Sequence, residues 1–120
     1  MTGGGRGIGR AIALRFARAG AWVAVAARTK REIESVAREV EREGGSGLAV
    51  EMDVTDLASV ERGVGETLEC AGGVLDVLIN NAGVFAIHPF PELSPATWYR
   101  MLATNLGGPF HVTLLALRGL

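Results

Sequence analysis

The sequence has few of the residues that build disulfide frameworks and metal centres. Cys70 is the one cysteine among 120 residues, so no internal disulfide can form. On an apolar helical face, we expect this residue to be a small core side chain. No cluster of cysteines and histidines has the spacing of metal ligands. The net charge of -1 gives no support for a nucleic-acid or membrane-surface partner.

Long apolar runs are also absent. None reaches the length that crosses a membrane. The glycine-rich start lacks the basic and then apolar stretches of a signal peptide. We therefore expect a soluble, cytoplasmic protein in a reducing compartment. Hydrophobic residues make up 48% of the chain, which is enough for the core of one ordinary domain.

Apolar residues recur with spacings that alternate between those of helices and those of buried strands. Ile8, Ile12 and Phe16 recur every fourth residue and predict a helix. The continuous apolar run over 22–26 is typical of a strand buried on both faces. The predicted elements are, in chain order, a helix over 7–19 ended by Gly20, a strand over 22–26, a helix carrying Ile33, Val36, Ala37 and Val40 and ended by Gly44 and Gly45, a strand over 48–52, a helix capped by Thr55 or Asp56, a strand over 74–79, and a helix opened by Ser94 and Pro95.

This order of elements predicts the fold class. Strands that alternate with helices imply right-handed crossovers and a parallel sheet, as in the α/β, Rossmann-like doubly wound folds. One element is missing from the pattern. A phosphate-binding glycine loop normally follows a strand, whereas here the loop begins at Thr2. We therefore expect a partial sheet without its first strand, in a chain trimmed at both ends.

The glycine cluster at the start of the chain is the first candidate site. Residues 2–9 read T-G-G-G-R-G-I-G, which is neither G-x-G-x-x-G nor a Walker loop. By itself, such a cluster is equally typical of a flexible turn. The predicted helix that follows favours an anion site. Glycines let the backbone approach a phosphate closely, and free N–H groups at a helix start attract negative charge.

Three further stretches follow the glycine cluster in order. They are Asp53-Val54 after the second predicted strand, Asn80-Asn81-Ala82-Gly83 after the third, and Asn105-Leu106 with Gly108 and Phe110 in the final helix. Together with the spacing T-G-x-x-x-G-x-G, these motifs resemble those of the short-chain dehydrogenase/reductase family. The resemblance covers essentially the whole chain, but the chain is only about half of a usual family member.

The resemblance implies that residues 1–120 form part of a single NAD(P)-binding Rossmann domain that lacks its first strand and its C-terminal half. It implies an oxidoreductase that interconverts a carbonyl and an alcohol of a small molecule by hydride transfer. The residues expected at the cofactor are Gly3, Gly4, Gly5, Arg6, Gly7, Ile8, Gly9, Arg28, Asp53, Val54, Asn81, Ala82 and Gly83.

Individual roles also follow from the resemblance. Asp53 would accept a hydrogen bond from the adenine amino group, and Val54 would line the adenine pocket. Asn81 and its two successors would lie near the adenosine ribose, while Asn80 would tie neighbouring strands together. Without the resemblance, Asp53 reads as a helix-capping or solvated carboxylate and the asparagine pair as a turn.

The end of the first predicted strand bears on the choice of dinucleotide. An NAD enzyme of this fold usually places Asp or Glu there to bind the ribose 2′-OH, but this strand ends Ala26-Ala27-Arg28. Arg28 can pair with a 2′-phosphate, often through two hydrogen bonds. Arg6 can flank the phosphate from the glycine loop. We therefore predict NADP(H) in preference to NAD(H), the alternative being that both arginines are solvated surface charges.

Asn105 is the one residue of the family's catalytic set that matches a position in this chain. A lone asparagine on an apolar helical stripe is more often a satisfied buried polar group. Pro109 stands four residues later and has no N–H, so the Asn105 carbonyl loses its usual helical donor. Water is the obvious replacement. In the family, the backbone at this position holds a water of a proton relay, so we assign Asn105 to the catalytic set.

The other catalytic groups of the family have no match in this chain. The family uses a serine, a tyrosine and a lysine four residues after the tyrosine. Here the single tyrosine, Tyr99, is followed at that spacing by Ala103, and the single lysine is Lys30. Ser94 reads as a helix cap. We expect the missing groups beyond Leu120 and expect the 120-residue chain to be inactive; the rival is a non-catalytic dinucleotide-binding or regulatory protein on this fold.

Substrate identity and assembly stay open. His88 and His111 have no partners at a recognisable spacing, so we expect both to be structural. Family members commonly form homodimers or homotetramers, partly through the last helix of this chain. Its Leu114, Leu115 and Leu117 fit either such a contact or a buried helix. If the 120 residues were the whole natural product, we would expect poor stability, because the missing strand lies at the centre of the family's sheet.

Overall fold

The centre of the molecule is a parallel pair of strands joined by a helix. In the computed structural model, which describes residues 1–120, β1 (Trp22–Ala27) pairs with β2 (Ser46–Glu51) from Trp22 opposite Ser46 to Ala27 opposite Glu51. Helix α2 (Lys30–Arg42) connects them. This is the crossover that the alternating pattern predicts, although β2 begins and ends earlier than the predicted 48–52.

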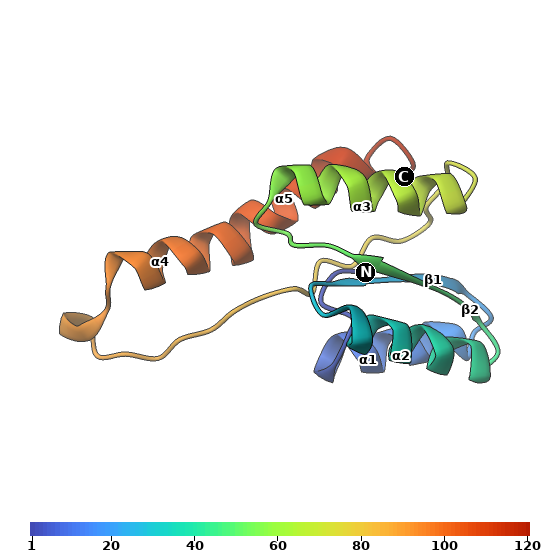
Figure 1. The fold of residues 1–120 in the computed structure, drawn as a ribbon, viewed down its shortest axis with the longest axis horizontal. Coiled ribbons are helices and arrows are strands. Elements are labelled where there is room, and N and C mark those ends of the chain that lie inside the picture. The colour runs from blue at the N-terminus through green and yellow to red at the C-terminus, as the bar shows by residue number, and fades with distance from the viewer.

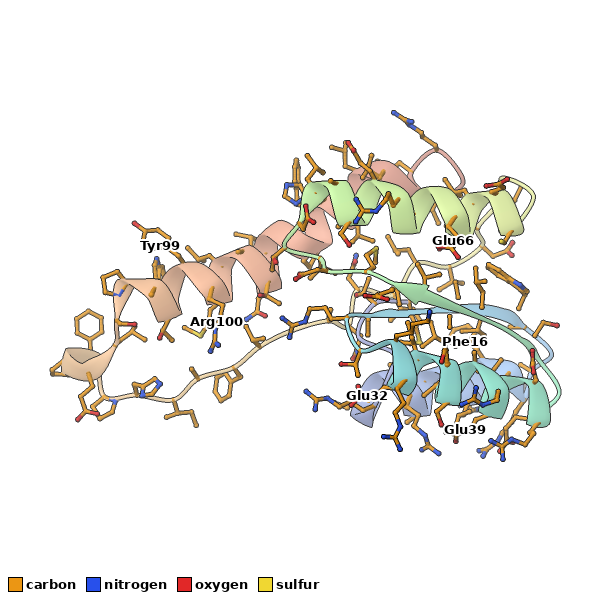
Figure 2. The ribbon with its side chains drawn as sticks, in the orientation of Figure 1. Phe16, Glu32, Glu39, Glu66, Tyr99 and Arg100 are labelled. Carbon is orange, nitrogen blue, oxygen red and sulfur yellow. The ribbon has the colours of Figure 1, made fainter.

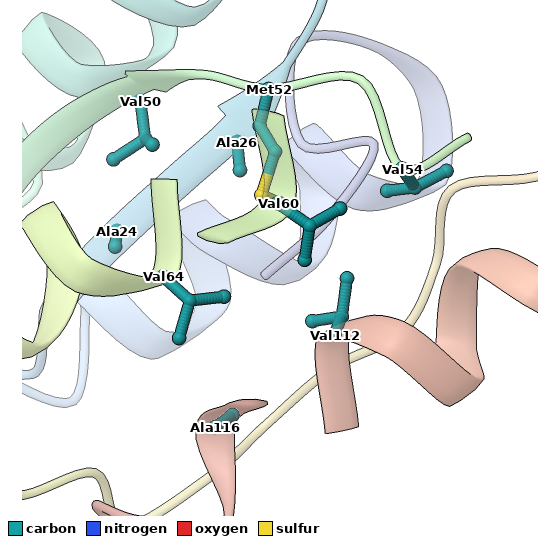
Figure 3. Packing of buried hydrophobic residues seen from close by; sticks show 9 residues of the cluster. All are labelled: Ala24, Ala26, Val50, Met52, Val54, Val60, Val64, Val112 and Ala116. Atoms are coloured by element: carbon teal, nitrogen blue, oxygen red, sulfur yellow. The ribbon is translucent and has the colours of Figure 1, made fainter. Parts of the chain in front are cut away.

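Helices cover both faces of this pair (Figure 1). Helix α1 (Gly7–Ala17) and α2 lie on one face, and α3 (Leu57–Cys70) and α5 (Gly108–Ala116) lie on the other. Successive β1 residues point to opposite faces, so two cores form. The first contains Ala13, Leu14, Ala17, Val23, Val25, Ile33, Val36 and Val40. The second, drawn in Figure 3, contains Ala24, Ala26, Val50, Met52, Val54, Val60, Val64, Val112 and Ala116.

The predicted strand over 74–79 is wrong, because these residues form no regular strand. A strand needs a neighbouring strand to pair with, and this segment has only Met1 and Thr2 beside it. Thr2 forms parallel bridges to Ala26 and Asn80, and its N–H donates to the Ile79 carbonyl at 2.9 Å. Beyond Met1, a mainly apolar cavity of about 560 Å³ separates β1 from this segment. The backbone of 74–79 therefore runs along the cavity without a ladder.

The predicted final helix is a helical run in three parts, α4 (Pro95–Leu102), the π-helix η2 (Ala103–Gly107) and α5. The predicted cap is present, since Ser94 Oγ accepts a hydrogen bond from the Thr97 N–H at 3.1 Å. The π-turn precedes Pro109, which has no N–H, and the Gly108 N–H bonds five residues back to the Ala103 carbonyl. The missing donor is therefore accommodated by one widened turn.

Residues 84–102, including the short 3-10 helix η1 (Phe90–Glu92), project from the rest of the molecule as an arm (Figure 1). The arm exposes large apolar side chains, among them Phe85, Ile87 and Phe90. Cys70 is also exposed, at the end of α3, so the expectation of a core cysteine is wrong. Cys70 stands two residues after Leu68, which packs against the second core, so it lies about 200° around the helix and faces away from that core. No helix of the structure combines the length and the apolar character that crossing a bilayer requires.

The cap of α3 gives a test of this fold. Asp56 Oδ1 accepts a hydrogen bond from the Ala58 N–H at 3.1 Å, which satisfies one free donor at the helix start. We expect Asp56→Ala to lower the free energy of unfolding by about 1 kcal/mol. Glu61→Ala, on the exposed face of the same helix, should change it by less than about 0.5 kcal/mol. Urea unfolding followed by circular dichroism compares the two, and equal effects would contradict the capping role.

Candidate functional site

The glycine loop is shaped by close contacts that no side chain would permit. Gly3 has φ +64, and a Cβ there would lie 2.8 Å from the Ala82 Cα. A Cβ on Gly9 would collide with the Gly3 carbonyl oxygen and lie 2.6 Å from Asn81 Nδ2. The start of α1 and residues 81–82 therefore press directly on the loop. The loop leads directly into the first turn of α1, and free N–H groups at a helix start attract an anion.

Hydrogen bonds from Thr2 and Asn81 lock the loop to the segment that follows residue 79. Asn81 Nδ2 donates to the carbonyls of Thr2 and Gly3 at 3.2 and 3.0 Å. The N–H groups of Asn81 and Ala82 both donate to Thr2 Oγ1 at 3.1 Å. The tie expected of Asn80 is thus made by the side chain of Asn81. Asn80 forms its bridge to Thr2 through the backbone, and its side chain donates to Thr113 Oγ1 on α5.

A cavity of about 570 Å³ opens beside the loop, at the carboxyl ends of β1 and β2. Ligands of open α/β sheets bind at this edge of the strands. The sequence-predicted residues that line the cavity are Gly3, Gly5, Arg6, Ile8, Gly9, Arg28, Asp53, Val54, Asn81, Ala82 and Gly83. Four separate stretches of the chain therefore converge on one space.

Gly4 and Gly7, which the sequence also assigns to the cofactor, do not line this cavity. A Cβ on Gly4 would lie 2.6 Å from Val25 Cγ1, so its hydrogen lets the loop pack on β1. Gly7 has φ +55 and opens α1, with free space where a Cβ would stand. Both residues therefore act on the shape of the loop.

Asp53 is held in its charged form at the mouth of the cavity. Its Oδ1 accepts hydrogen bonds from the Thr55 N–H at 2.9 Å and the Thr55 hydroxyl at 2.7 Å. Partial burial opposes ionisation, but these bonds and the nearby charge of Arg28 outweigh it, so the pKa of Asp53 lies below its ordinary value of 3.8. No protein group donates to Oδ2, which leaves that oxygen available to a ligand.

Arg6 and Arg28 face the cavity with no carboxylate partner. Elsewhere on the surface, Arg10 pairs with Glu39 and Arg18 with Glu43, but neither cavity arginine forms an ion pair. Both are exposed. These two guanidinium groups lie with the glycine loop and the carboxylate of Asp53 around one cavity, an arrangement suited to a phosphorylated and hydroxylated ligand.

Comparison with known proteins agrees with this geometry. The sequence profile described as short chain dehydrogenase matches residues 1–120, the whole chain. The chain belongs to the short-chain dehydrogenase family. It is 39% identical over 108 residues to a sorbitol dehydrogenase of Cereibacter sphaeroides, covering 90% of this chain and 41% of that protein. It is 38% identical over 122 residues to an L-rhamnose 1-dehydrogenase (NAD(P)(+)) of Azotobacter vinelandii, covering 98% of this chain and 47% of that protein.

Solved structures of family members also superimpose on this chain. An alcohol dehydrogenase from the archaeon Thermococcus sibiricus, complexed with 5-hydroxy-NADP, superimposes with a TM-score of 0.92 at 34% identity, over 98% of this chain and 50% of that one. A Serratia marcescens short-chain dehydrogenase/reductase variant gives 0.92 at 38% identity, over 99% and 49%. The Rossmann-like α/β class is therefore established, and the chain spans half or less of each of these relatives. The family as a whole consists of oxidoreductases.

Asn105, predicted as a catalytic residue, lies in the π-turn η2 and outside the cavity lining. Its Oδ1 accepts a hydrogen bond from the Val84 N–H and its Nδ2 donates to the Val84 carbonyl, both at 2.8 Å. The side chain therefore clamps the segment after Gly83 to the helix. Its place in a proton relay stays a prediction.

Other predicted non-catalytic residues lie away from the cavity. Tyr99 is exposed on α4 and does not pack as expected. His111 lies edge-on to Phe110, with ring centroids 5.6 Å apart, and its buried Nδ1 has no partner. His88 is exposed on the arm. None of the three lines the cavity at the glycine loop.

Sequence reasoning missed part of the cavity lining. The additional residues are Ala26, Ala27, Thr29, Glu32, Met52, Thr55, Val84, Arg100 and Thr104. Glu32 could have been found from its place two residues after the start of α2, immediately behind the tip of β1. Arg100 and Thr104 carry no such signal, because only the fold of the arm brings α4 back to the cavity.

The charge state of Asp53 gives a test within the cavity. Thr55→Val removes the hydroxyl donor, so the pKa of Asp53 should move up toward 3.8. A lowered pKa stabilises the folded chain above the ordinary value, and this stability is lost as the pH falls through the folded value. The variant should therefore be less stable than the wild type at pH 7, and this difference should vanish in acid.

An NMR titration of the Asp53 carboxyl measures this pKa directly, and Thr55→Ser, which keeps the hydroxyl, is the matched control. An Asp53 pKa that does not move in Thr55→Val, or that moves equally in Thr55→Ser, would contradict the assignment.

Proposed function

We propose that this chain is the dinucleotide-binding part of an NADP(H)-dependent oxidoreductase that reduces a carbonyl, or oxidises an alcohol, of a small molecule. The observation that carries the proposal is the cavity at the carboxyl ends of β1 and β2, where the glycine loop meets Arg28 and Asp53. Two relatives support it. One is named L-rhamnose 1-dehydrogenase (NAD(P)(+)), and the other is an alcohol dehydrogenase whose structure is complexed with 5-hydroxy-NADP.

The residues present fit a dinucleotide. The absence of a side chain at Gly3 and Gly9 lets the loop pack closely on residues 81–82, and α1 begins at Gly7 with free N–H groups that favour an anion such as a pyrophosphate. The open Oδ2 of Asp53 is placed to accept a hydrogen bond from an adenine amino group. When such a dinucleotide is bound, its nicotinamide ring would accept or donate the hydride.

Arg28 and Arg6 support NADP(H) in preference to NAD(H). The β1 tip carries Ala27 and Arg28 in place of the carboxylate that would bind a ribose 2′-OH and repel a 2′-phosphate. Neither arginine has an ion-pair partner, so both guanidinium groups are free to bind a phosphate. A guanidinium matches two phosphate oxygens with two parallel N–H donors.

We propose two further roles for the helical run from α4 to α5, one in catalysis and one in assembly. We place Asn105 in the catalytic set through its position in the π-turn before Pro109. We also propose that the longer protein assembles as a homodimer or homotetramer through the run from α4 to α5, where Leu106 on η2 and Phe110 and Leu114 on α5 are exposed. Neither role alters the choice of cofactor.

The alternative is a non-catalytic dinucleotide-binding protein. It rests on the same fold and the same cavity, because a fold does not fix a reaction. The two hypotheses differ in one feature, which is whether the longer protein carries that pair together with a serine. They make the same prediction for dinucleotide binding by this chain.

Arg28→Ala tests the preference for NADP(H). Loss of a charge-assisted contact to a phosphate should weaken binding of NADPH about tenfold or more and leave NADH nearly unchanged. Arg31→Ala removes an exposed arginine on α2 outside the cavity and should change neither affinity. Isothermal titration calorimetry of the wild type and both variants measures the effect, and a wild type that prefers NADH would refute the proposal.

The 120-residue chain should bind NADPH without oxidising it. It holds no tyrosine and lysine at the spacing of the family's acid, so we expect no group in it to be positioned to pass a proton to a carbonyl oxygen. Absorbance at 340 nm, followed with NADPH and a panel of ketones and aldehydes, should not fall above the rate without protein. Turnover that saturates with substrate would show that other residues of this chain act as the acid and base.

A further inference from the structure

A third charged group, the carboxylate of Glu32, lies on the same part of the cavity as Arg6 and Arg28. Glu32 is in the first turn of α2 and is half-buried. Its Cβ and Oε2 lie 3.1 and 3.2 Å from the position where a Cβ of Gly5 would stand. Figure 2 shows it at the N-terminal end of α2, the end next to the glycine loop. The carboxylate therefore packs against the loop.

The local structure explains why this carboxylate faces the cavity. Ile33, the next residue, packs into the core between α2 and β1. The side chain of Glu32 is thereby set at the edge of that core, toward Gly5. Glu34 and Glu39 on the same helix have cationic partners, Lys30 at 3.9 Å and Arg10. Glu32 has none.

The charges around Glu32 determine what it can do. The cavity lining holds three cations, Arg6, Arg28 and Arg100, and one other carboxylate, Asp53. Asp53 is engaged by Thr55, so Glu32 is the carboxylate free of protein hydrogen bonds on the glycine-loop side. An unpaired carboxylate accepts a hydrogen bond from a ribose hydroxyl and repels a phosphate.

We infer that Glu32 sets the ratio of the affinities for phosphorylated and unphosphorylated dinucleotides. The inference rests on the proposed function, because it concerns the same site. Arg28 and Arg6 attract a 2′-phosphate, whereas Glu32 opposes it and offers an acceptor to a free 2′-hydroxyl. The site then binds NAD(H) as well as NADP(H), with a smaller preference for NADP(H) than its two arginines alone would give.

Glu32→Gln is the direct test, because it removes the charge and keeps the shape that packs on Gly5. NADPH should bind about three- to tenfold more tightly, since a repelling charge near the phosphate is gone. NADH should bind equally well or slightly less well, since an amide oxygen is a weaker acceptor than a carboxylate. The ratio of the two dissociation constants should therefore shift toward NADPH by up to about tenfold.

Glu34→Gln is the matched control. It changes the net charge by the same amount on the same helix, but Glu34 lies outside the cavity and pairs with Lys30. We expect it to leave the affinity ratio unchanged. Thermal unfolding of both variants establishes that each is folded before calorimetry with NADPH and NADH.

Three outcomes count against the inference. An equal change of both affinities in Glu32→Gln would mean that the residue shapes the loop without discriminating the phosphate. The same ratio shift in Glu34→Gln would mean that net charge alone is responsible. A wild type that binds neither dinucleotide would refute the proposed function and this inference together, whereas a wild type that binds both with an unmoved ratio in Glu32→Gln refutes only the inference.

Discussion

Thr2 joins the two halves of the cavity, because its backbone and its hydroxyl bond to different segments of the chain. Its backbone bridges Ala26 on β1 and Asn80, and its Oγ1 accepts from the N–H groups of Asn81 and Ala82. The residue is 3% exposed, so these bonds form away from water, where an unpaired polar group would be costly. The glycine loop and residues 81–83 consequently face each other at a fixed spacing. These bonds, together with the two from the Asn81 side chain, join the two sides of the cavity.

The spacing of apolar residues was enough to predict the elements that are buried along their own length. The apolar stripe of α2 and the continuous apolar run over 22–26 in β1 are read directly from the sequence, and these residues are buried in the structure except Trp22 at the start of β1. The segment 74–79 shows the limit of such reasoning. Its apolar run is typical of a buried strand, but a strand exists only through its neighbour, and here only Met1 and Thr2 lie beside it. The π-turn before Pro109 could be predicted only in part. The missing N–H of Pro109 predicts an interrupted helix, but it does not determine that the interruption is a π-turn.

The cavity shows the same division between local and distant signals. Asp53 and Arg28 stand at strand ends, where the fold class itself directs attention, and both line the cavity. Glu32 is the third residue of α2, and the direction of its side chain depends on how the neighbouring Ile33 packs into the core. Arg100 and Thr104 come from α4 and η2, more than forty residues after β2, and reach the cavity only because the chain turns back at η1. Charges that modulate a site are therefore harder to predict than the backbone that forms it.

Two cavities of nearly equal volume lie on either side of Met1 and Thr2, and their linings determine which one can hold a charged ligand. The cavity between β1 and residues 74–79 is lined mainly by apolar side chains, and desolvation there lowers the pKa of the Met1 amino group to about 6. A pyrophosphate would lose its hydration in that space without gaining donors. The cavity at the glycine loop offers backbone N–H groups and unpaired arginines instead. Binding of a dinucleotide therefore belongs to the carboxyl edge of the strands, however the apolar cavity is filled.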